Sequence, residues 1–331
     1  MIHIQEEQGL DFDDVLLQPS ISTCTSRDLV DTSVETKHFT LKIPIISSPM
    51  VGVSSVKLIA ELGKLGGIGI LPRFYSKKER GRQIAELEML TPLFGVAIGA
   101  RPEIQKDEMI LVEYALMRGA KLICIDTANG YLKNIRDFSA QIRKTFGYNF
   151  ALMSGNVVDY SGARILNFCG TNLIRVGIGS GSICTTRNIT GVGSAQLTAI
   201  KNCTGSFLEI VADGGIRNSG DALKALVFGA KFIMLGKLLA QTEEADNNGT
   251  LYGMASKTNQ VNNGHKIKSV EGMNISIGEK IPLKDFIERF MYGIKSGCTY
   301  IGVDRLSDIK NKHILIQKIN NSIKPWKQEW L

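Results

Sequence analysis

The stretch GAKLICID, residues 119–126, places a glycine immediately before a short apolar run. The same arrangement recurs at Gly170-Thr171-Asn172 and Gly229-Ala230-Lys231, and helix-length segments with apolar residues at three- and four-residue spacing lie between the apolar runs. Glycine is frequent just after the last helical residue, because it adopts the left-handed conformation that ends a helix. The repeat therefore predicts units in which a helix, a glycine and a buried strand follow one another.

Eight apolar runs of this kind occur, at residues 44–47, 67–71, 93–98, 122–126, 150–154, 173–177, 208–212 and 232–236. Each run is typical of a buried parallel strand. Eight strand and helix repeats predict an α/β fold, a (β/α)8 TIM barrel that forms a single domain over residues 1–331. An open doubly wound sheet usually has fewer strands and an early GxGxxG turn, whereas the glycine-rich turns here come late.

The composition excludes several classes of protein. No apolar run approaches the roughly 18 residues of a membrane span, and the N-terminus has neither a secretory signal nor a transit peptide. We therefore expect a soluble, cytoplasmic protein without a membrane partner. The formal net charge is +7, but the basic residues are interleaved with acids, so nucleic-acid binding has only charge in its favour. The six cysteines lie at least 15 residues apart, which excludes a CxxC redox pair or zinc knuckle.

In a barrel the active site forms on the loops that follow the strands. The loop GIGSGSICTTR, residues 177–187, is rich in glycine and hydroxyl groups and carries Cys184. Its backbone amides can hold a phosphate and its carbonyls a monovalent cation. Cys184 is either a nucleophile at the barrel mouth or an inert buried cysteine. No histidine is near it in the sequence, which disfavours a protease of the Cys/His type.

Further glycine-rich turns follow other strands. Asp213-Gly214-Gly215 and Gly236 match the usual phosphate-binding corner of barrel enzymes, where bare amides and a carboxylate bind phosphate and ribose. They could equally be two tight turns. Together with Ser182 they would surround one nucleotide. Gly155-Asn156 is expected to begin the loop after the fifth strand.

The region after the eighth strand departs from a minimal barrel. Residues 241–282 are polar, contain two Asn-Asn-Gly sequences and lack helical periodicity. Such a segment indicates a long active-site flap that becomes ordered on binding. Glu271 lies within it and is either solvated or a proton carrier. Residues 283–296 are amphipathic and predict a closing helix, followed by a basic C-terminal tail over about 310–331.

These loops resemble those of the family of IMP dehydrogenases and GMP reductases. The resemblance extends from LDFDDVL, residues 10–16, to CTYIG, residues 298–302, and is most specific in the loop that carries Cys184. It implies that Cys184 attacks carbon 2 of a purine nucleotide, with Thr186 and Glu271 as the other catalytic residues. The residues implied to bind this substrate are Ser182, Asp213, Gly214, Gly215, Gly236, Lys237, Gly253, Met254, Lys268 and Ser269. Carbonyls of Gly179, Gly181 and Cys184 would hold potassium.

Three features favour the reductase branch. Residues 184–187 continue to TGVG at 190–193, residues 126–131 read DTANGY, and the flap lacks the adjacent Arg-Tyr pair with which the dehydrogenase activates water. Ser180 and residues 218–221, by contrast, look more like the dehydrogenase, and Val51 stands where the family usually has aspartate. No inserted regulatory (CBS) module is present, since only a helix-length segment separates the second and third strands.

The resemblance also implies a cofactor and an assembly. The cofactor NADPH would contact Asp126, Thr127, Ala128, Asn129, Gly130 and Tyr131, while Ser26 and Arg27 would reach the cofactor of a neighbouring subunit in a homotetramer. Arg27 suits the extra phosphate of NADPH.

The implied reaction is the reductive deamination of GMP to IMP and ammonia through a covalent cysteine-purine intermediate, in purine nucleotide salvage. One alternative is an IMP dehydrogenase without the regulatory module, which makes XMP with NAD⁺. Another is a catalytically silent barrel that binds a purine nucleotide.

Overall fold

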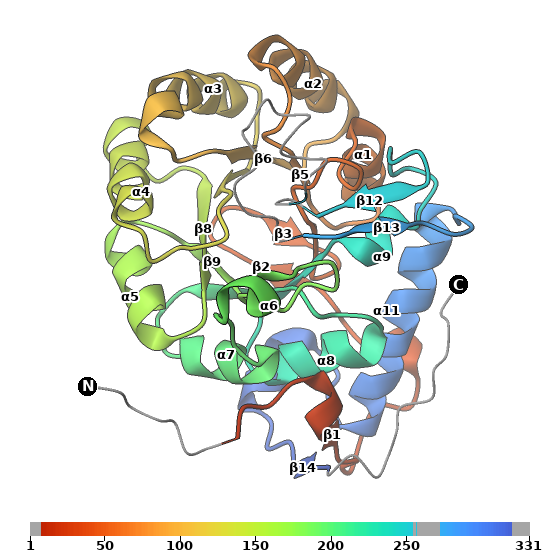
Figure 1. The fold of residues 1–331 in the computed structure, drawn as a ribbon. Coiled ribbons are helices and arrows are strands. Elements are labelled where there is room, and N and C mark those ends of the chain that lie inside the picture. Colours follow the sequence, from red (N-terminus) through yellow and green to blue (C-terminus); the bar gives the residue numbers. More distant parts are fainter. Residues whose placement is uncertain (1–7, 254–255, 257–271, 320–331) are drawn as a thin grey trace.

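Parallel strands form a closed barrel at the centre of the molecule (Figure 1). The computed structural model describes residues 8–253, 256 and 272–319. Its eight-stranded sheet has the order β4-β11-β10-β9-β8-β7-β6-β5, and a parallel bridge between Ile46 and Ile68 joins the two ends. The strands are β4 (Ile45–Ser47), β5 (Gly69–Leu71), β6 (Phe94–Ile98), β7 (Leu122–Ile125), β8 (Ala151–Val157), β9 (Leu173–Val176), β10 (Glu209–Asp213) and β11 (Phe232–Leu235). The predicted (β/α)8 barrel is confirmed.

Each predicted apolar run overlaps one of these strands. The largest difference is β8, which continues to Val157 with a register shift between Gly155 and Val157. The expected loop at Gly155-Asn156 is therefore wrong, because both residues belong to the strand. Similarly, Asp213 is the last residue of β10 and not the first of a loop.

Helices surround the barrel, as Figure 1 shows. They are α1 (Val56–Lys64), α2 (Lys77–Leu90), α3 (Gln105–Met117), α4 (Lys133–Phe146), α5 (Tyr160–Phe168), α7 (Gln196–Cys203), α8 (Ser219–Val227) and α11 (Leu283–Tyr300), with short α6 (Thr186–Thr190) and α9 (Lys237–Ala240) at the barrel mouth. Side chains of Ser55, Ser76, Asp159 and Asn218 cap the first turns of α1, α2, α5 and α8. The repeated glycines have φ of 86° at Gly119, 84° at Gly170 and 117° at Gly229, as their place after a helix requires.

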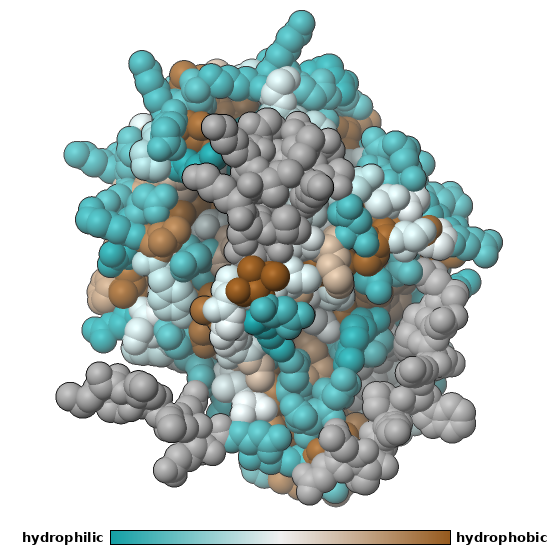
Figure 2. Space-filling view, viewed as in Figure 1, coloured by the Kyte–Doolittle hydropathy of each residue, from teal (hydrophilic) through white to brown (hydrophobic). Residues whose placement is uncertain are grey.

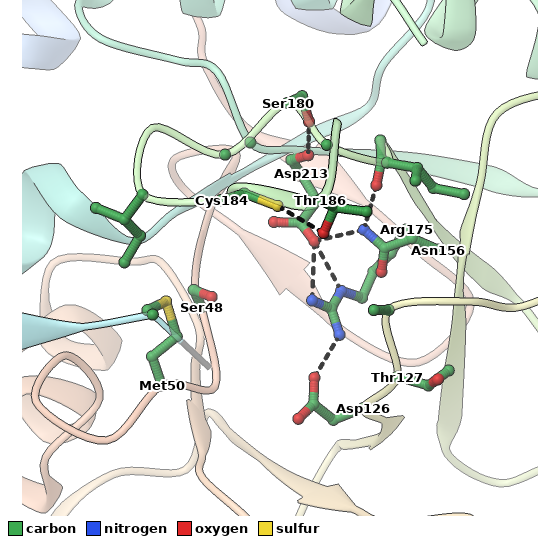
Figure 3. A pocket seen from close by; sticks show the side chains of 18 residues that line it. Ser48, Met50, Asp126, Thr127, Asn156, Arg175, Ser180, Cys184, Thr186 and Asp213 are labelled. Atoms are coloured by element: carbon green, nitrogen blue, oxygen red, sulfur yellow. Dashed lines mark hydrogen bonds and ion pairs between the residues drawn. The ribbon is translucent and has the colours of Figure 1, made fainter. Parts of the chain in front are cut away.

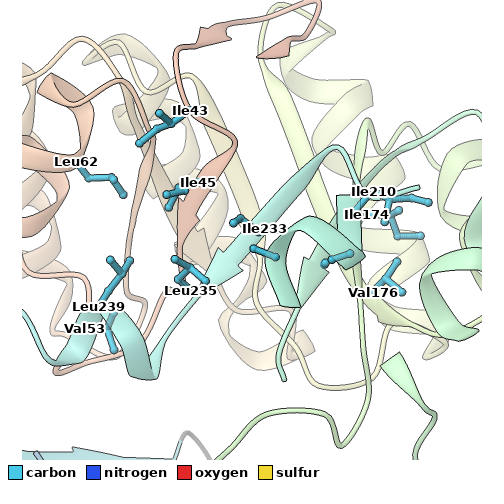
Figure 4. Packing of buried hydrophobic residues seen from close by; sticks show 14 of the residues in the cluster. Ile43, Ile45, Val53, Leu62, Ile174, Val176, Ile210, Ile233, Leu235 and Leu239 are labelled. Atoms are coloured by element: carbon cyan, nitrogen blue, oxygen red, sulfur yellow. The ribbon is translucent and has the colours of Figure 1, made fainter. Parts of the chain in front are cut away.

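Two layers of apolar side chains stabilise this arrangement. Along β11, Ile233 and Leu235 belong to the larger cluster, which lies between strands and helices (Figure 4). Phe232 and Met234 alternate with them and belong to the cluster inside the barrel. Alternation of this kind follows from the two-residue period of a strand. The barrel is thus packed on both faces, which explains why its strands read as continuous apolar runs.

The sequence pattern did not predict a hairpin that fills the barrel interior. Strands β2 (Val34–Glu35) and β3 (Thr40–Leu41) pair antiparallel, and Val34, Phe39 and Leu41 belong to the interior cluster. The ring of Phe39 lies 6.2 Å from the ring of Phe232. Short strands with few apolar residues give too little periodicity to be recognised, yet this hairpin packs into the interior of the barrel.

The described part of the predicted C-terminal tail, up to residue 319, contains secondary structure. The predicted closing helix is confirmed as α11, which extends four residues beyond the predicted end at residue 296. The chain then forms the 3₁₀ helix η4 (Leu306–Asn311) and strand β14 (Ile316–Lys318). Strand β14 pairs antiparallel with β1 (Val15–Leu17), so residues near the two ends of the described chain hold each other in place.

Candidate active site

A cavity of about 230 Å³ lies at the carboxyl ends of the barrel strands. Its wall includes Ser48 and Met50 after β4, Asp126 to Ala128 after β7, and Gly177 to Gly181, Ile183 and Cys184 after β9. Asp213 at the end of β10, Gly214 directly after it, and Gly253 also line the cavity. The cavity therefore collects residues from strands that are far apart in the sequence, as expected for the mouth of a barrel.

The face that carries the barrel mouth is mostly hydrophilic around its rim, and apolar side chains appear on it as separate spots (Figure 2). Among the described residues no helix is long and apolar enough to cross a membrane.

The thiol of Cys184 lies against the hydroxyl of Thr186. The distance from Sγ to Oγ1 is 3.1 Å, and the thiol donates to the hydroxyl oxygen (Figure 3). A turn fixes the position of Cys184, because its amide donates to the carbonyl of Gly181 at 3.0 Å. Cys184 is half-buried and lines the cavity. Two of the three predicted catalytic residues are thus brought together at one wall.

Close backbone packing holds the loop of Cys184 against the end of β10. Gly214 has a φ of 98°, and a Cβ atom there would lie 2.5 Å from Ser180 Oγ and 2.9 Å from the amide nitrogen of Gly181. The Ser180 hydroxyl donates to the carbonyl of Asp213 at 3.0 Å. Only glycine fits at position 214, because both its conformation and its surroundings exclude a side chain.

A buried ion-pair network forms the floor of the cavity. The guanidinium of Arg175 donates to Asp126 Oδ1 at 2.8 Å and to Asp213 Oδ2 at 3.1 and 2.8 Å. Arg73 donates to the other oxygen of Asp126 at 3.0 Å. Figure 3 shows Arg175 between the two carboxylates. The network therefore joins the predicted cofactor loop, through Asp126, to the predicted nucleotide carboxylate, Asp213.

The charges in this network determine the ionisation of Asp126. Burial by itself would raise the pKa of Asp126, but the guanidinium groups of Arg175 and Arg73 lower that pKa below its ordinary value. Burial would lower the pKa of Arg175, but the carboxylates of Asp213 and Asp126 raise that pKa above its ordinary value. Both groups are therefore charged at neutral pH.

Asn156 adds a polar group that has an unused acceptor. Its Nδ2 donates to Asp213 Oδ2 at 2.8 Å and to the carbonyl of Gly177 at 2.7 Å. Its Oδ1 is buried and has no hydrogen-bond partner among the described residues. Buried polar atoms are nearly always paired, so this oxygen is suited to accept a hydrogen bond from a ligand in the cavity, whose wall includes Asn156.

The base of the predicted flap is attached to the loop of Cys184. Strands β12 (Thr250–Tyr252) and β13 (Asn274–Ser276) form an antiparallel ladder. The amide of Met273 donates to the carbonyl of Ile183 at 3.0 Å, and Cys184 forms an isolated bridge with Gly272. A Cβ atom on Gly253 would lie 2.8 Å from Cα of Gly272. A movement of β12 and β13 would therefore displace Cys184.

The other predicted residues are distributed around this centre. Ser182 and Lys237 line a second cavity, of about 560 Å³. Gly215 packs on Phe12, and Gly236 approaches Met50. Asp126, Thr127 and Ala128 line the first cavity, whereas Asn129, Gly130 and Tyr131 are not among its lining residues. Met254, Lys268, Ser269 and Glu271 lie outside the described residues.

Two predicted residues lie away from both cavities. Ser26 caps the 3₁₀ helix η2 (Arg27–Leu29), and the guanidinium of Arg27 stacks 4.6 Å from the ring centre of Tyr292 on α11. The expected role of Ser26 and Arg27 towards a neighbouring subunit stays a prediction.

Arg175 and Asn156 were missed in the sequence. One signal was available for Arg175, since it is the charged residue within the apolar run LIRV of β9. A charge buried in a barrel strand has to be paired, which points to a carboxylate on a neighbouring strand. Asn156 carried no comparable signal, because the run was expected to end before it.

Comparisons with known proteins agree with the geometry. A family model described as IMP dehydrogenase / GMP reductase domain matches residues 9–325. The chain is 32% identical to a GMP reductase of Phytophthora infestans, over 96% of this chain and 92% of that protein. It is 32% identical to GMP reductase 2 of Bos taurus over 98% of each chain, and 31% identical to a GMP reductase of Klebsiella pneumoniae over 96% of each. The family model covers most of the chain, and the chain carries a cysteine loop at the mouth of a (β/α)8 barrel. The chain therefore belongs to the IMP dehydrogenase / GMP reductase family.

Proposed function

We propose that this protein catalyses the NADPH-dependent reductive deamination of GMP to IMP and ammonia. The observation that carries the proposal is the contact between Cys184 and Thr186 in a cavity that also contains the cofactor-type loop at Asp126. The names of the curated relatives support the reductase branch. Purine nucleotide salvage in the cytoplasm is the role that this reaction would serve.

The nucleotide would bind along the ends of β9, β10 and β11. All hydrogen bonds of the Asp213 carboxylate to described residues fall on Oδ2, so Oδ1 is left for a ribose hydroxyl. The phosphate would meet the backbone amides of Gly214, Gly215 and Gly236, together with Ser182 and Lys237. The purine would then lie beside Gly253, with its carbon 2 next to Cys184.

The residues present fit a nicotinamide cofactor on the opposite wall. Thr127 and Ala128 line the cavity, and Asn156 Oδ1 offers a buried acceptor without a partner among the described residues. NADPH, when bound, supplies the hydride that reduces carbon 2. Arg175 holds Asp126 and Asp213 in fixed positions, so the cofactor side and the nucleotide side of the cavity keep a constant separation.

The cysteine would act as the nucleophile. Its sulfur forms a bond to carbon 2, the bond from carbon 2 to the amino nitrogen breaks, and the nitrogen leaves with an added proton as ammonia. Thr186, within hydrogen-bond distance of Sγ, would hold or pass the proton at this position. Glu271 is the proposed second proton carrier. After reduction the carbon-sulfur bond breaks, which releases IMP and restores the thiol.

Potassium and the quaternary structure complete the proposal. Carbonyls of Gly179, Gly181 and Cys184 would bind potassium, and carbonyl oxygens are ligands that suit a hard cation. The Gly181 carbonyl accepts the Cys184 amide, which leaves its second lone pair for the ion. Residues 241–282 would close over the site as a flap. Ser26 and Arg27 would contact the NADPH of a neighbouring subunit in a homotetramer.

The test is a spectrophotometric assay of the full chain. GMP is paired with NADPH in one cuvette and IMP with NAD⁺ in another, and each assay is repeated with Cys184→Ala. Loss of the NADPH signal with release of ammonia, abolished in the variant, is the expected result. Growth of an NADH signal would assign the dehydrogenase reaction instead. Silence in both, with purine nucleotide binding retained, would identify a binding protein.

A further inference from the structure

The second cavity is larger than the predicted phosphate contacts require. Its volume is about 560 Å³, within the range of ligand pockets in proteins. It lies between the turn that leads into α8, helix α9 and helix α11, which converge on one side of the barrel (Figure 1). Of the described residues implied to bind the nucleotide, Ser182 and Lys237 line this cavity.

Three cationic side chains from different elements line this cavity: Arg217, Lys237 and Arg289. Arg217 is held in place by Asp13, at 2.6 Å, and by Asp221, at 2.9 Å. Lys237 and Arg289 form no ion pair with any described residue. Glu279 is the one acidic residue that the described part of the wall contributes, and it is exposed. Within the described part of the chain, the cavity therefore offers two cations, Lys237 and Arg289, that have no carboxylate as an ion-pair partner.

Helix α11 contributes an apolar part of the wall. Phe286 and Phe290 are buried and stacked, with ring centres 5.4 Å apart. Arg289 lies between them in the sequence of α11 and is exposed. A cation that emerges next to a water-poor wall interacts more strongly with an anion than one surrounded by water.

We propose that this cavity binds a second phosphoryl group, next to the 5′-phosphate of the nucleotide. The inference rests on the proposed function for one step only, the placement of the 5′-phosphate at Ser182 and Lys237. From there the second phosphoryl group is bound by Arg289 and by the ammonium of Lys237. It comes either from the β-phosphate of a guanosine diphosphate or from free inorganic phosphate bound beside GMP.

The experiment measures binding to the full chain by isothermal titration calorimetry. The ligands are GMP, GDP, and inorganic phosphate titrated both alone and in the presence of saturating GMP. The test variant is Arg289→Gln, which removes the charge without deleting the stem of the side chain. The matched control is Lys284→Gln on the same helix, whose side chain is exposed and paired with Glu288 at 3.8 Å.

If GDP is the source, Arg289→Gln weakens GDP binding by roughly three- to tenfold and leaves GMP binding and GMP reduction unchanged. If free phosphate is the source, the same variant removes phosphate binding in the presence of GMP. Equal affinities of the wild type and Arg289→Gln for GDP, and for phosphate with and without GMP, would overturn the proposal. A protein that binds phosphate through Arg289 but does not bind GMP would refute the proposed function and leave this site standing.

Discussion

Two nitrogens of Arg175, Nε and Nη2, both donate to the same oxygen of Asp213, Oδ2, at 3.1 and 2.8 Å. Both residues are largely removed from water. The contact fixes a residue of β9 to the neighbouring strand β10, directly beneath the loop of Cys184. Removal of either partner would leave a buried charge without its counter-ion and would lower the stability of the fold.

Replacement of Arg175 by methionine should destabilise the fold. The substitution leaves the buried carboxylates of Asp126 and Asp213 without the Arg175 guanidinium, and we expect the free energy of unfolding to fall by about 3–5 kcal/mol. Urea unfolding followed by circular dichroism gives the free energy. Arg82→Gln is the control, because Arg82 pairs with Glu79 and Glu86 on the exposed face of α2 and should leave the midpoint unchanged. Equal midpoints for Arg175→Met and the wild type would contradict this account.

Replacement of Gly214 by alanine should reduce catalysis by about 10²-fold, because the new Cβ would displace the loop of Cys184. Gly191→Ala is a matched control. Gly191 also has a positive φ, of 72°, but a Cβ atom there meets nothing within 4 Å. The control should cost about 1 kcal/mol in stability and little in kcat/KM. A similar loss of kcat/KM in both variants would show that backbone strain alone matters.

The cysteines should differ in their reactivity towards iodoacetamide. Burial raises the pKa of the Cys124, Cys203 and Cys298 thiols to about 12, so at pH 8 roughly one in ten thousand is ionised. Cys184 lines the open cavity. We expect mass spectrometry of the native protein to find label on Cys184 and not on these three.

Bound GMP should protect Cys184 from this reaction, and Cys184→Ser should lack the protected label. Protection of another cysteine in place of Cys184 would relocate the nucleotide.

The stability of the protein should fall in acid through Asp126. The pKa of Asp126 is lowered in the folded protein, so its contribution is complete above the unfolded pKa of about 4 and is lost as the pH falls through the lower folded value. Urea midpoints measured from pH 7 to pH 3 for the wild type and for Asp126→Asn check this. The two curves should converge below about pH 4. A constant difference over this whole range would mean that Asp126 has an ordinary pKa.

The sequence was sufficient for features that repeat or that depend on neighbouring residues. Eight apolar runs and the recurring glycines predicted the barrel, because strand periodicity and helix termination are local properties. The loop of Cys184 was recognisable for the same reason. Arg175 could not be paired with Asp126 and Asp213 from the sequence, since 49 and 38 residues separate them and only the closed sheet brings them together. The β2–β3 hairpin was missed because two-residue strands have no periodicity.

The β2–β3 hairpin limits the routes by which ligands can reach the site. Val34, Phe39 and Leu41 of the hairpin pack with the apolar side chains inside the barrel, so we expect no polar ligand to pass along the barrel axis. Nucleotide, cofactor and ammonia would all have to enter and leave through the cavity at the carboxyl ends of the strands. When two large ligands share one opening, the ligand that binds deeper has to bind first and dissociate last. We therefore expect substrate and cofactor to bind, and products to leave, in a compulsory order, because the β2–β3 hairpin leaves one route to the site.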